Sequence, residues 1–247
     1  MTKLAFGIHL PSSSEMKFHD ITSYARRCEE LGFDSVWVAD HILWGPSGGL
    51  YEPLTTLAAL SGSTERIRLG TSVLIVSMRN PIVLADITGT IQKATGGRLI
   101  LGVGVGWDQR EFECLEIDFE QRGAVTDECL EILCGLWSGR PFSYDGTHFT
   151  VKDIVIGAPP EQPPPIWIGG NSSRAIRRAA RYDAWFPTDP TLEEIKQGSV
   201  ALTRQIKTDN KPMMGAHIYL VTEDAEPERS AAFLTERNAE PPTQVRD

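Results

Sequence analysis

The feature that most constrains the fold is a regular return of short apolar segments along the first part of the chain. Four such segments begin at Leu4, Ser35, Arg68 and Leu99, at intervals of 31, 33 and 31 residues. Each interval has room for one strand, one helix and two loops. Repeated strand–helix units of this size form parallel sheets, so the spacing predicts either an α/β barrel or a doubly wound sheet.

The pattern continues after the fourth strand, with one interruption. Residues 142–151 alternate in polarity around Asp145-Gly146, which predicts a β-hairpin inserted after the fourth strand. We expect further strands at 166–169, 184–186 and 216–221. A helix is expected over 20–31 with Asp20 as its cap, and a second helix begins at Pro53. Further helices are expected over 81–95, 109–115, 127–137, 172–181 and 192–207.

The end of the chain does not complete the series. After Pro227 we expect a short helical piece to Glu236 and a loose polar tail over 236–247, and we find no eighth strand. A (β/α)8 barrel uses about 250 residues, and the chain has 247. We therefore predict one domain over 1–247, a TIM barrel with an insertion after strand 4 and an incomplete C-terminal strand and helix.

Composition argues against several classes of partner. The net charge of -9 disfavours nucleic acid. No apolar run approaches the ~20 residues of a membrane span. The N-terminus enters a strand pattern without a signal peptide, which predicts a cytoplasmic protein. The cysteines show no CxxC spacing and the histidines no HxH or HExxH spacing, so we predict neither disulfides nor a metal site.

Polar side chains follow the second strand directly. Asp40, His41 and Trp44 come at its carboxyl end, which is where active sites gather in parallel α/β folds. His9 similarly ends the first strand, and Trp107 follows the fourth. These residues can supply a proton carrier and flat walls to a pocket. The alternative is that Asp40-His41 is ordinary turn chemistry, a carboxylate bonded to nearby amides.

Two glycine-rich turns follow later strands. Residues 102–106 have glycine at every second position, which permits close approach of a flat ligand but lacks the GxGxxG form of a dinucleotide site. Residues 169–173 stand between a strand and a helix, where free amides bind phosphate well, with Arg174, Arg177 and Arg178 nearby. The alternative for this second turn is a serine-capped helix with solvated arginines.

These segments together resemble the bacterial luciferase-like family, and within it the enzymes that use the deazaflavin coenzyme F420. The resemblance runs from Leu4 to Phe186. It is carried, in order, by residues 30–41 (ELGFDSVWVADH), 68–74 (RLGTSVL), 97–107 (GRLILGVGVGW), 110–112 (REF) and 166–172 (IWIGGNS).

The resemblance implies a TIM barrel with a planar cofactor across the carboxyl ends of its strands. By position, Ser72-Val73 would form a non-proline cis peptide supporting the deazaflavin ring, and Val105 and Gly106 would line it. Asp40 and His41 would touch the ring edge, with His41 as proton donor and Asp40 setting its tautomer or binding the cofactor. Gly169, Gly170, Asn171 and Ser172 would bind the phosphate, and Trp44 would stack beside the substrate in a pocket shared with His9 and Trp107.

The substrate implied by the resemblance is a small organic molecule. The related F420-dependent glucose-6-phosphate dehydrogenases have an acidic residue where this chain has Trp107, so we expect a more apolar substrate here. A flavin mononucleotide (FMN)-dependent monooxygenase of the same family is the alternative. A degenerate cofactor-binding protein with little catalysis is the alternative from another class. Family resemblance also implies a homodimer.

Overall fold

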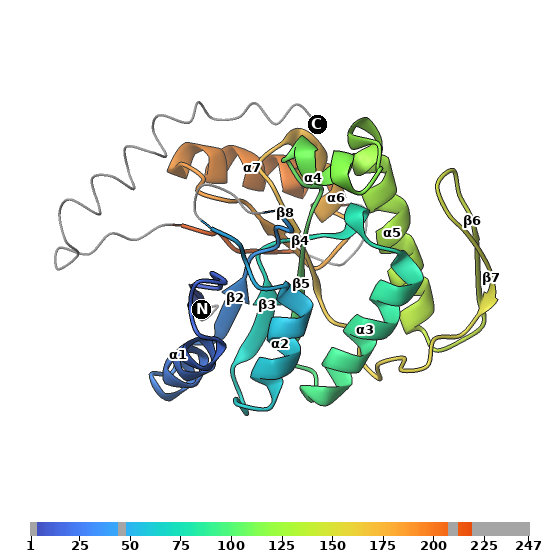
Figure 1. Ribbon diagram of the computed structural model, residues 1–247. Helices are drawn as coiled ribbons and strands as arrows, with labels where there is room; N and C mark the ends of the chain where they lie inside the picture. The colour runs from blue at the N-terminus through green and yellow to red at the C-terminus, as the bar shows by residue number, and fades with distance from the viewer. Residues whose placement is uncertain (1–3, 44–47, 207–211, 219–247) are drawn as a thin grey trace.

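Eight of the described strands form one curled sheet with parallel pairing (Figure 1). The structure, a computed structural model, describes residues 4–43, 48–206 and 212–218. The strands are paired in the order β1-β2-β3-β5-β8-β9-β10, and β4 pairs with β5. Their bounds are β1 Gly7–His9, β2 Ser35–Val38, β3 Arg68–Thr71, β4 Leu74–Ile75, β5 Leu99–Gly104, β8 Ile166–Gly169, β9 Ala184–Phe186 and β10 Met213–Met214.

Helices connect the strands and pack outside the sheet (Figure 1). This alternation confirms the predicted barrel-type fold, and over the described residues the sheet is a curled, open half-barrel. The helices are α1 Phe18–Glu30, α2 Pro53–Ser61, α3 Pro81–Ala94, α4 Gln109–Cys114, α5 Arg122–Trp137, α6 Ser173–Ala179 and α7 Leu192–Gln205.

Several predicted bounds were wrong. β1 begins at Gly7 rather than at Leu4, and α5 begins at Arg122 rather than at residue 127. Helix α1 begins at Phe18 with Lys17 as its N-cap, and Asp20 instead lies in the first turn, where a carboxylate is favourable beside the helix dipole. β3 ends at Thr71, and β4 follows it and pairs with β5. The last described strand lies at Met213–Met214 rather than over 216–221, because Met213 pairs with Ala184. An isolated bridge from His217 to Thr188 continues that ladder.

The insertion between β5 and β8 contains α4, a short 3-10 helix η2 (Phe119–Gln121), α5 and the predicted hairpin. The hairpin is confirmed: β6 (Phe142–Asp145) pairs antiparallel with β7 (Thr150–Ile154). Glu128 of α5 accepts backbone N–H bonds from residues 147–149 at the turn. The hairpin is thereby fixed to the helix that precedes it, and Figure 1 shows it beside α5.

The core lies between the sheet and its helices. Trp137 and Trp185 are among the largest fully buried side chains. Inside the curled sheet, Trp37, Trp167 and Phe186 form an aromatic cluster with ring centroids 4.9–5.4 Å apart. Trp37 and Trp137 are both buried. In the described part of the chain, no helix is long and apolar enough to cross a membrane.

Candidate functional site

The most chemically distinctive contact joins His41, just beyond β2, to Glu111 of α4. His41 Nδ1 lies 3.1 Å from Glu111 Oε2. The other carboxylate oxygen of Glu111 accepts backbone N–H bonds from Ile42 at 2.6 Å and Leu43 at 3.3 Å. The Glu111 side chain is 1% exposed and that of His41 is 30% exposed. A buried carboxylate therefore fixes both the ring and the backbone of this loop, while the imidazole keeps an accessible edge.

Asp40 has a different environment from the one predicted. Its carboxylate, 1% exposed, accepts bonds from both terminal nitrogens of Arg79, at 2.6 and 2.9 Å, and from the backbone N–H of Ile75 at 2.8 Å. The prediction that Asp40 sets the tautomer of His41 is wrong, because Glu111 occupies Nδ1 and the oxygens of Asp40 are engaged. Burial opposes the charge on Arg79, but Asp40 and Glu52 raise the pKa of Arg79 above its usual value.

Trp107 forms one wall beside His41. The two rings meet edge to face, with centroids 5.3 Å apart and planes at 71°. Trp107 is 56% exposed, so its ring is accessible to a ligand. Trp44, assigned to the same pocket, lies outside the described residues.

His9 is not brought against His41. Its ring stacks on that of His217, with centroids 5.1 Å apart and planes 1° apart. Burial and the neighbouring imidazole lower the pKa of His9 to about 4. His9 is therefore neutral near pH 7 and has an environment distinct from that of His41.

The peptide bond between Ser72 and Val73 is cis, which confirms the geometry implied by the family resemblance. Val73 also explains part of the glycine pattern. A Cβ at Gly104 would lie 2.4 Å from Val73 Cγ2, and one at Gly102 would lie 1.9 Å from the Thr71 carbonyl oxygen. These two glycines make room for the neighbouring strand rather than for a ligand, which corrects that part of the sequence interpretation.

The loop after β8 has its side chains largely engaged. Ser172 caps α6 by accepting the N–H of Ala175 at 3.1 Å. The Asn171 amide donates to and accepts from the backbone of Thr188, at 2.9 and 3.0 Å. Gly170 has φ of +107°, a conformation that favours glycine. Any contribution of Asn171 to phosphate binding therefore comes from its main chain.

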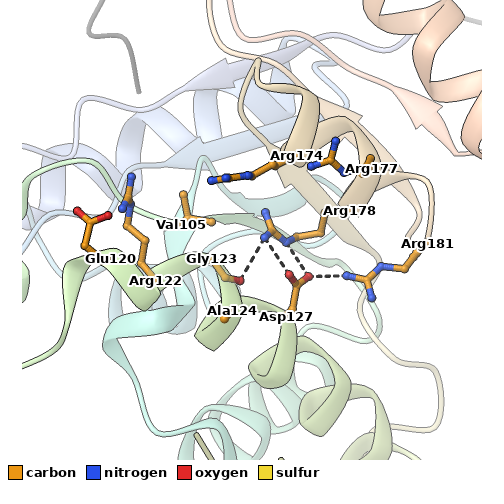
Figure 2. A pocket seen from close by; sticks show the side chains of 10 residues that line it. All are labelled: Val105, Glu120, Arg122, Gly123, Ala124, Asp127, Arg174, Arg177, Arg178 and Arg181. Carbon is orange, nitrogen blue, oxygen red and sulfur yellow. Dashed lines mark hydrogen bonds and ion pairs between the residues drawn. The ribbon is translucent and has the colours of Figure 1, made fainter. Parts of the chain in front are cut away.

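A cavity of about 460 Å³ lies between α5 and α6 (Figure 2). Its lining includes Val105, which the sequence assigned to the cofactor, and arginines from both helices. Figure 2 shows Arg178 and Arg181 converging on Asp127 of α5. His41 and Ser72-Val73 do not line this cavity. In the described residues no group of histidine, cysteine and acidic side chains could hold a metal ion.

Sequence reasoning missed Glu111 and Arg79 as site residues. Glu111 belongs to the Arg110-Glu-Phe112 motif that carried the resemblance, so its presence was noted but its role was not. Arg79 follows a 3-10 turn (Val76–Met78) and reaches back to Asp40, 39 residues earlier. No local pattern identifies such a pair. The cue for both was a charge close to a buried strand end.

Comparison with known proteins agrees with this geometry. The family model for the luciferase-like monooxygenases matches residues 2–239. An F420-dependent glucose-6-phosphate dehydrogenase from Amycolatopsis mediterranei is 32% identical over 79% of this chain and 64% of its own length. A protein of the same name from Microbacterium testaceum is 37% identical over 76% of this chain and 59% of its own. The chain thus spans less than two thirds of the length of these relatives.

A solved structure shares the fold. A monooxygenase from Streptomyces bottropensis superimposes with a TM-score of 0.79 at 22% identity, covering 96% of this chain and 78% of that one. The sheet order, the cis peptide and the match of the family model over nearly the whole sequence agree with one another. The chain belongs to the luciferase-like monooxygenase family.

Proposed function

We propose that this chain is the catalytic part of an F420-dependent oxidoreductase that transfers a hydride between the deazaflavin and a small, apolar organic substrate. The observation that carries the proposal is the partly exposed His41 with its Nδ1 on buried Glu111. The names of the two relatives support F420 as the cofactor.

The residues present fit such a cofactor. Trp167 Nε1 is a buried donor without a hydrogen-bond partner in the described residues, on the inner face of the sheet beside Val73. A polar ring edge in that interior would satisfy it. Ser72, Val73, Val105 and Gly106 would hold the ring portion, whereas the buried carboxylate of Asp40 would act through Arg79. The main chain of the loop 169–172 would hold the phosphate.

When bound, the deazaflavin supplies a hydride carrier. The residues of this chain would donate or accept the proton that accompanies hydride transfer. An ionised carboxylate accepts hydrogen bonds, so Glu111 favours the tautomer with hydrogen on Nδ1 of His41 and directs Nε2 away from Glu111. In the imidazolium form Nε2 also carries a proton, on the edge of the ring that points away from Glu111, and this edge suits a general acid. Asp40 contributes through Arg79, by keeping the loop after β2 in place.

The substrate proposal depends on Trp107. Its exposed ring beside His41 offers apolar area and no charge to a substrate. The ring itself provides no cation to compensate the charge of a sugar phosphate bound against it. We therefore propose that alcohols or ketones with apolar substituents are better substrates than glucose 6-phosphate.

The test measures F420 binding by fluorescence quenching and hydride transfer by the deazaflavin absorbance. We expect wild type to bind F420 more tightly than FMN and to reduce it with an apolar secondary alcohol. His41→Gln should lower kcat/KM by about 10²–10⁴-fold with F420 binding nearly unchanged. The matched control is His19→Gln, since His19 is 85% exposed on α1. Equal activity of the two variants would remove His41 from the mechanism.

The alternative function is an FMN-dependent monooxygenase, which the name of the matching family model favours. Tighter binding of FMN than of F420, with oxygen consumed in the presence of reduced flavin, would support it. Binding of neither cofactor would leave a member of the family with little catalysis. Homodimer formation, a single domain over 1–247 and a cytoplasmic location remain our proposals. Sedimentation would test homodimer formation, and cell fractionation would test the cytoplasmic location.

A further inference from the structure

The cavity between α5 and α6 contains more positive charge than its own carboxylates balance. Five arginines line it: Arg122, Arg174, Arg177, Arg178 and Arg181. The lining carboxylates are Glu120 and Asp127 (Figure 2). In a chain with net charge -9, such a local excess of guanidinium groups favours anions.

The arginines divide into an engaged set and an open pair. Arg178, 8% exposed, bonds to Asp127 at 2.9 and 3.1 Å and to the Gly123 carbonyl at 3.2 Å. Arg181 also pairs with Asp127. Arg122, 3% exposed, donates to the Gly106 and Phe119 carbonyls. These contacts build the inner wall of the cavity.

Arg174 and Arg177 form the open pair. Both are exposed on α6, and within the described residues neither guanidinium makes a hydrogen bond or an ion pair. Figure 2 shows them on the same side of the cavity, with Arg174 extending above Val105. A guanidinium offers five N–H donors in a planar fork that matches carboxylate and phosphate oxygens. The open pair is therefore suited to a ligand with more than one negative group.

The cavity adjoins the residues assigned to the cofactor. Val105 belongs to both sets, and Arg174 follows the capping Ser172 by two positions. The main-chain N–H groups of the loop 169–172 suffice for one phosphate, so the open pair would serve charges beyond it. Coenzyme F420 carries such charges, because glutamate residues follow its phosphate.

We propose that Arg174 and Arg177 bind the glutamate carboxylates of coenzyme F420, so that the cavity is a second anchoring site for this cofactor beyond the phosphate. The proposal rests on the proposed function. It also assigns a direction to the bound cofactor, with its side chain leaving past Val105 toward α6.

The experiment compares intact F420 with the truncated coenzyme that ends before the glutamates. Binding of each is measured by fluorescence quenching to wild type and to the double variant Arg174→Gln/Arg177→Gln. Two charge-assisted hydrogen bonds are removed, so we expect intact F420 to bind the double variant at least about tenfold more weakly. Binding of the truncated coenzyme should change by less than about twofold, since it does not reach the pair.

The matched control is Arg26→Gln/Arg140→Gln, which removes the same charge from exposed arginines outside the cavity. Equal losses in the two double variants, or equal losses for the intact and truncated coenzymes, would overturn the proposal. The first result would mean that only the overall charge of the protein matters, and the second that the open pair acts on a part of the cofactor that the two coenzymes share.

A second probe separates this proposal from the proposed function. Inorganic pyrophosphate, titrated by calorimetry, carries clustered charge without a deazaflavin. If neither coenzyme binds wild type but pyrophosphate binds it at least about tenfold more tightly than the double variant, the anion site remains and the cofactor assignment fails. If pyrophosphate also binds wild type and the double variant equally, the anion site and the cofactor assignment both fail.

Discussion

The ends of β1 and β2 lie side by side in the sheet, with His9 in register with Trp37. The ionisable side chains at these two ends nevertheless have different kinds of partner. At the end of β1, His9 stacks on His217, and burial together with this neighbour lowers the pKa of His9. At the end of β2, Asp40 faces Arg79 and His41 faces Glu111. The partner, rather than the position at a strand end, decides whether a group can hold charge.

The largest effect is expected where the β2 end is disrupted. Asp40→Ala leaves Arg79 largely buried, with the half-exposed Glu52 as its remaining charged partner among the described residues and the Ile75 carbonyl as a neutral one. Removing one member of a buried ion pair costs about 3–5 kcal/mol, and we expect a loss of this size in the free energy of unfolding, measured by urea denaturation. Glu52→Gln is the control, because it removes the charge facing Arg79 but keeps an oxygen for the Thr55 N–H that caps α2, and it should cost less than about 1 kcal/mol. Similar losses for the two variants would contradict the assignment of Asp40 as the main partner of Arg79.

The β1 end predicts a pH effect on stability. The pKa of His9 is about 4 in the folded protein against 6.5 for the free side chain. Between these two pKa values, His9 therefore binds a proton in the unfolded chain but not in the folded protein. The stabilisation is complete above pH 6.5 and is lost as pH falls toward 4, by about 3 kcal/mol for the 2.5-unit difference.

His9→Gln isolates this contribution. The free energies of unfolding of wild type and variant, measured across pH 4–7, should converge by about 3 kcal/mol as pH falls. Since the comparison uses slopes, a constant cost of the substitution does not affect it. Parallel curves would mean that His9 titrates normally and that the contrast between the two strand ends is absent.

The fold was largely predictable because its signals are local and repeated. Strand spacing near 31–33 residues identified the parallel units, and Asp145-Gly146 located the hairpin. The last strand was misplaced because its two residues, Met213 and Met214, are too few to produce a pattern. The cis peptide at Ser72-Val73 was expected only from family resemblance, since no pattern in the sequence alone indicates one.

The site was less predictable because its pairs join distant segments. His41 and Glu111 are 70 residues apart, so no spacing rule connects them. Because Asp40 and His41 are adjacent in the sequence, we expected the carboxylate to contact the imidazole. In the structure Asp40 instead pairs with Arg79, and His41 pairs with Glu111. The alternating glycines likewise suggested ligand space, although Thr71 and Val73 of the adjacent segment occupy it. The role of each of these residues therefore depends on which distant segment packs against it, and residue type alone does not indicate that segment.

The remaining prediction tests whether the partner of His41 tunes its chemistry. In Glu111→Gln the amide oxygen can still accept from Ile42 and Leu43, but the NH₂ group then faces His41 Nδ1. An NH₂ donor favours the opposite tautomer and removes the charge that stabilises imidazolium. We expect kcat/KM for F420 reduction to fall about 10–100-fold, the usual cost of losing a residue that orients a reactive group. Glu113→Gln is the control, because Glu113 is exposed on the same helix and its side chain accepts a hydrogen bond from Gln109. Activity close to that of wild type in Glu111→Gln would mean that Glu111 only braces the loop, and the β2 end would then differ from the β1 end in structure but not in proton chemistry.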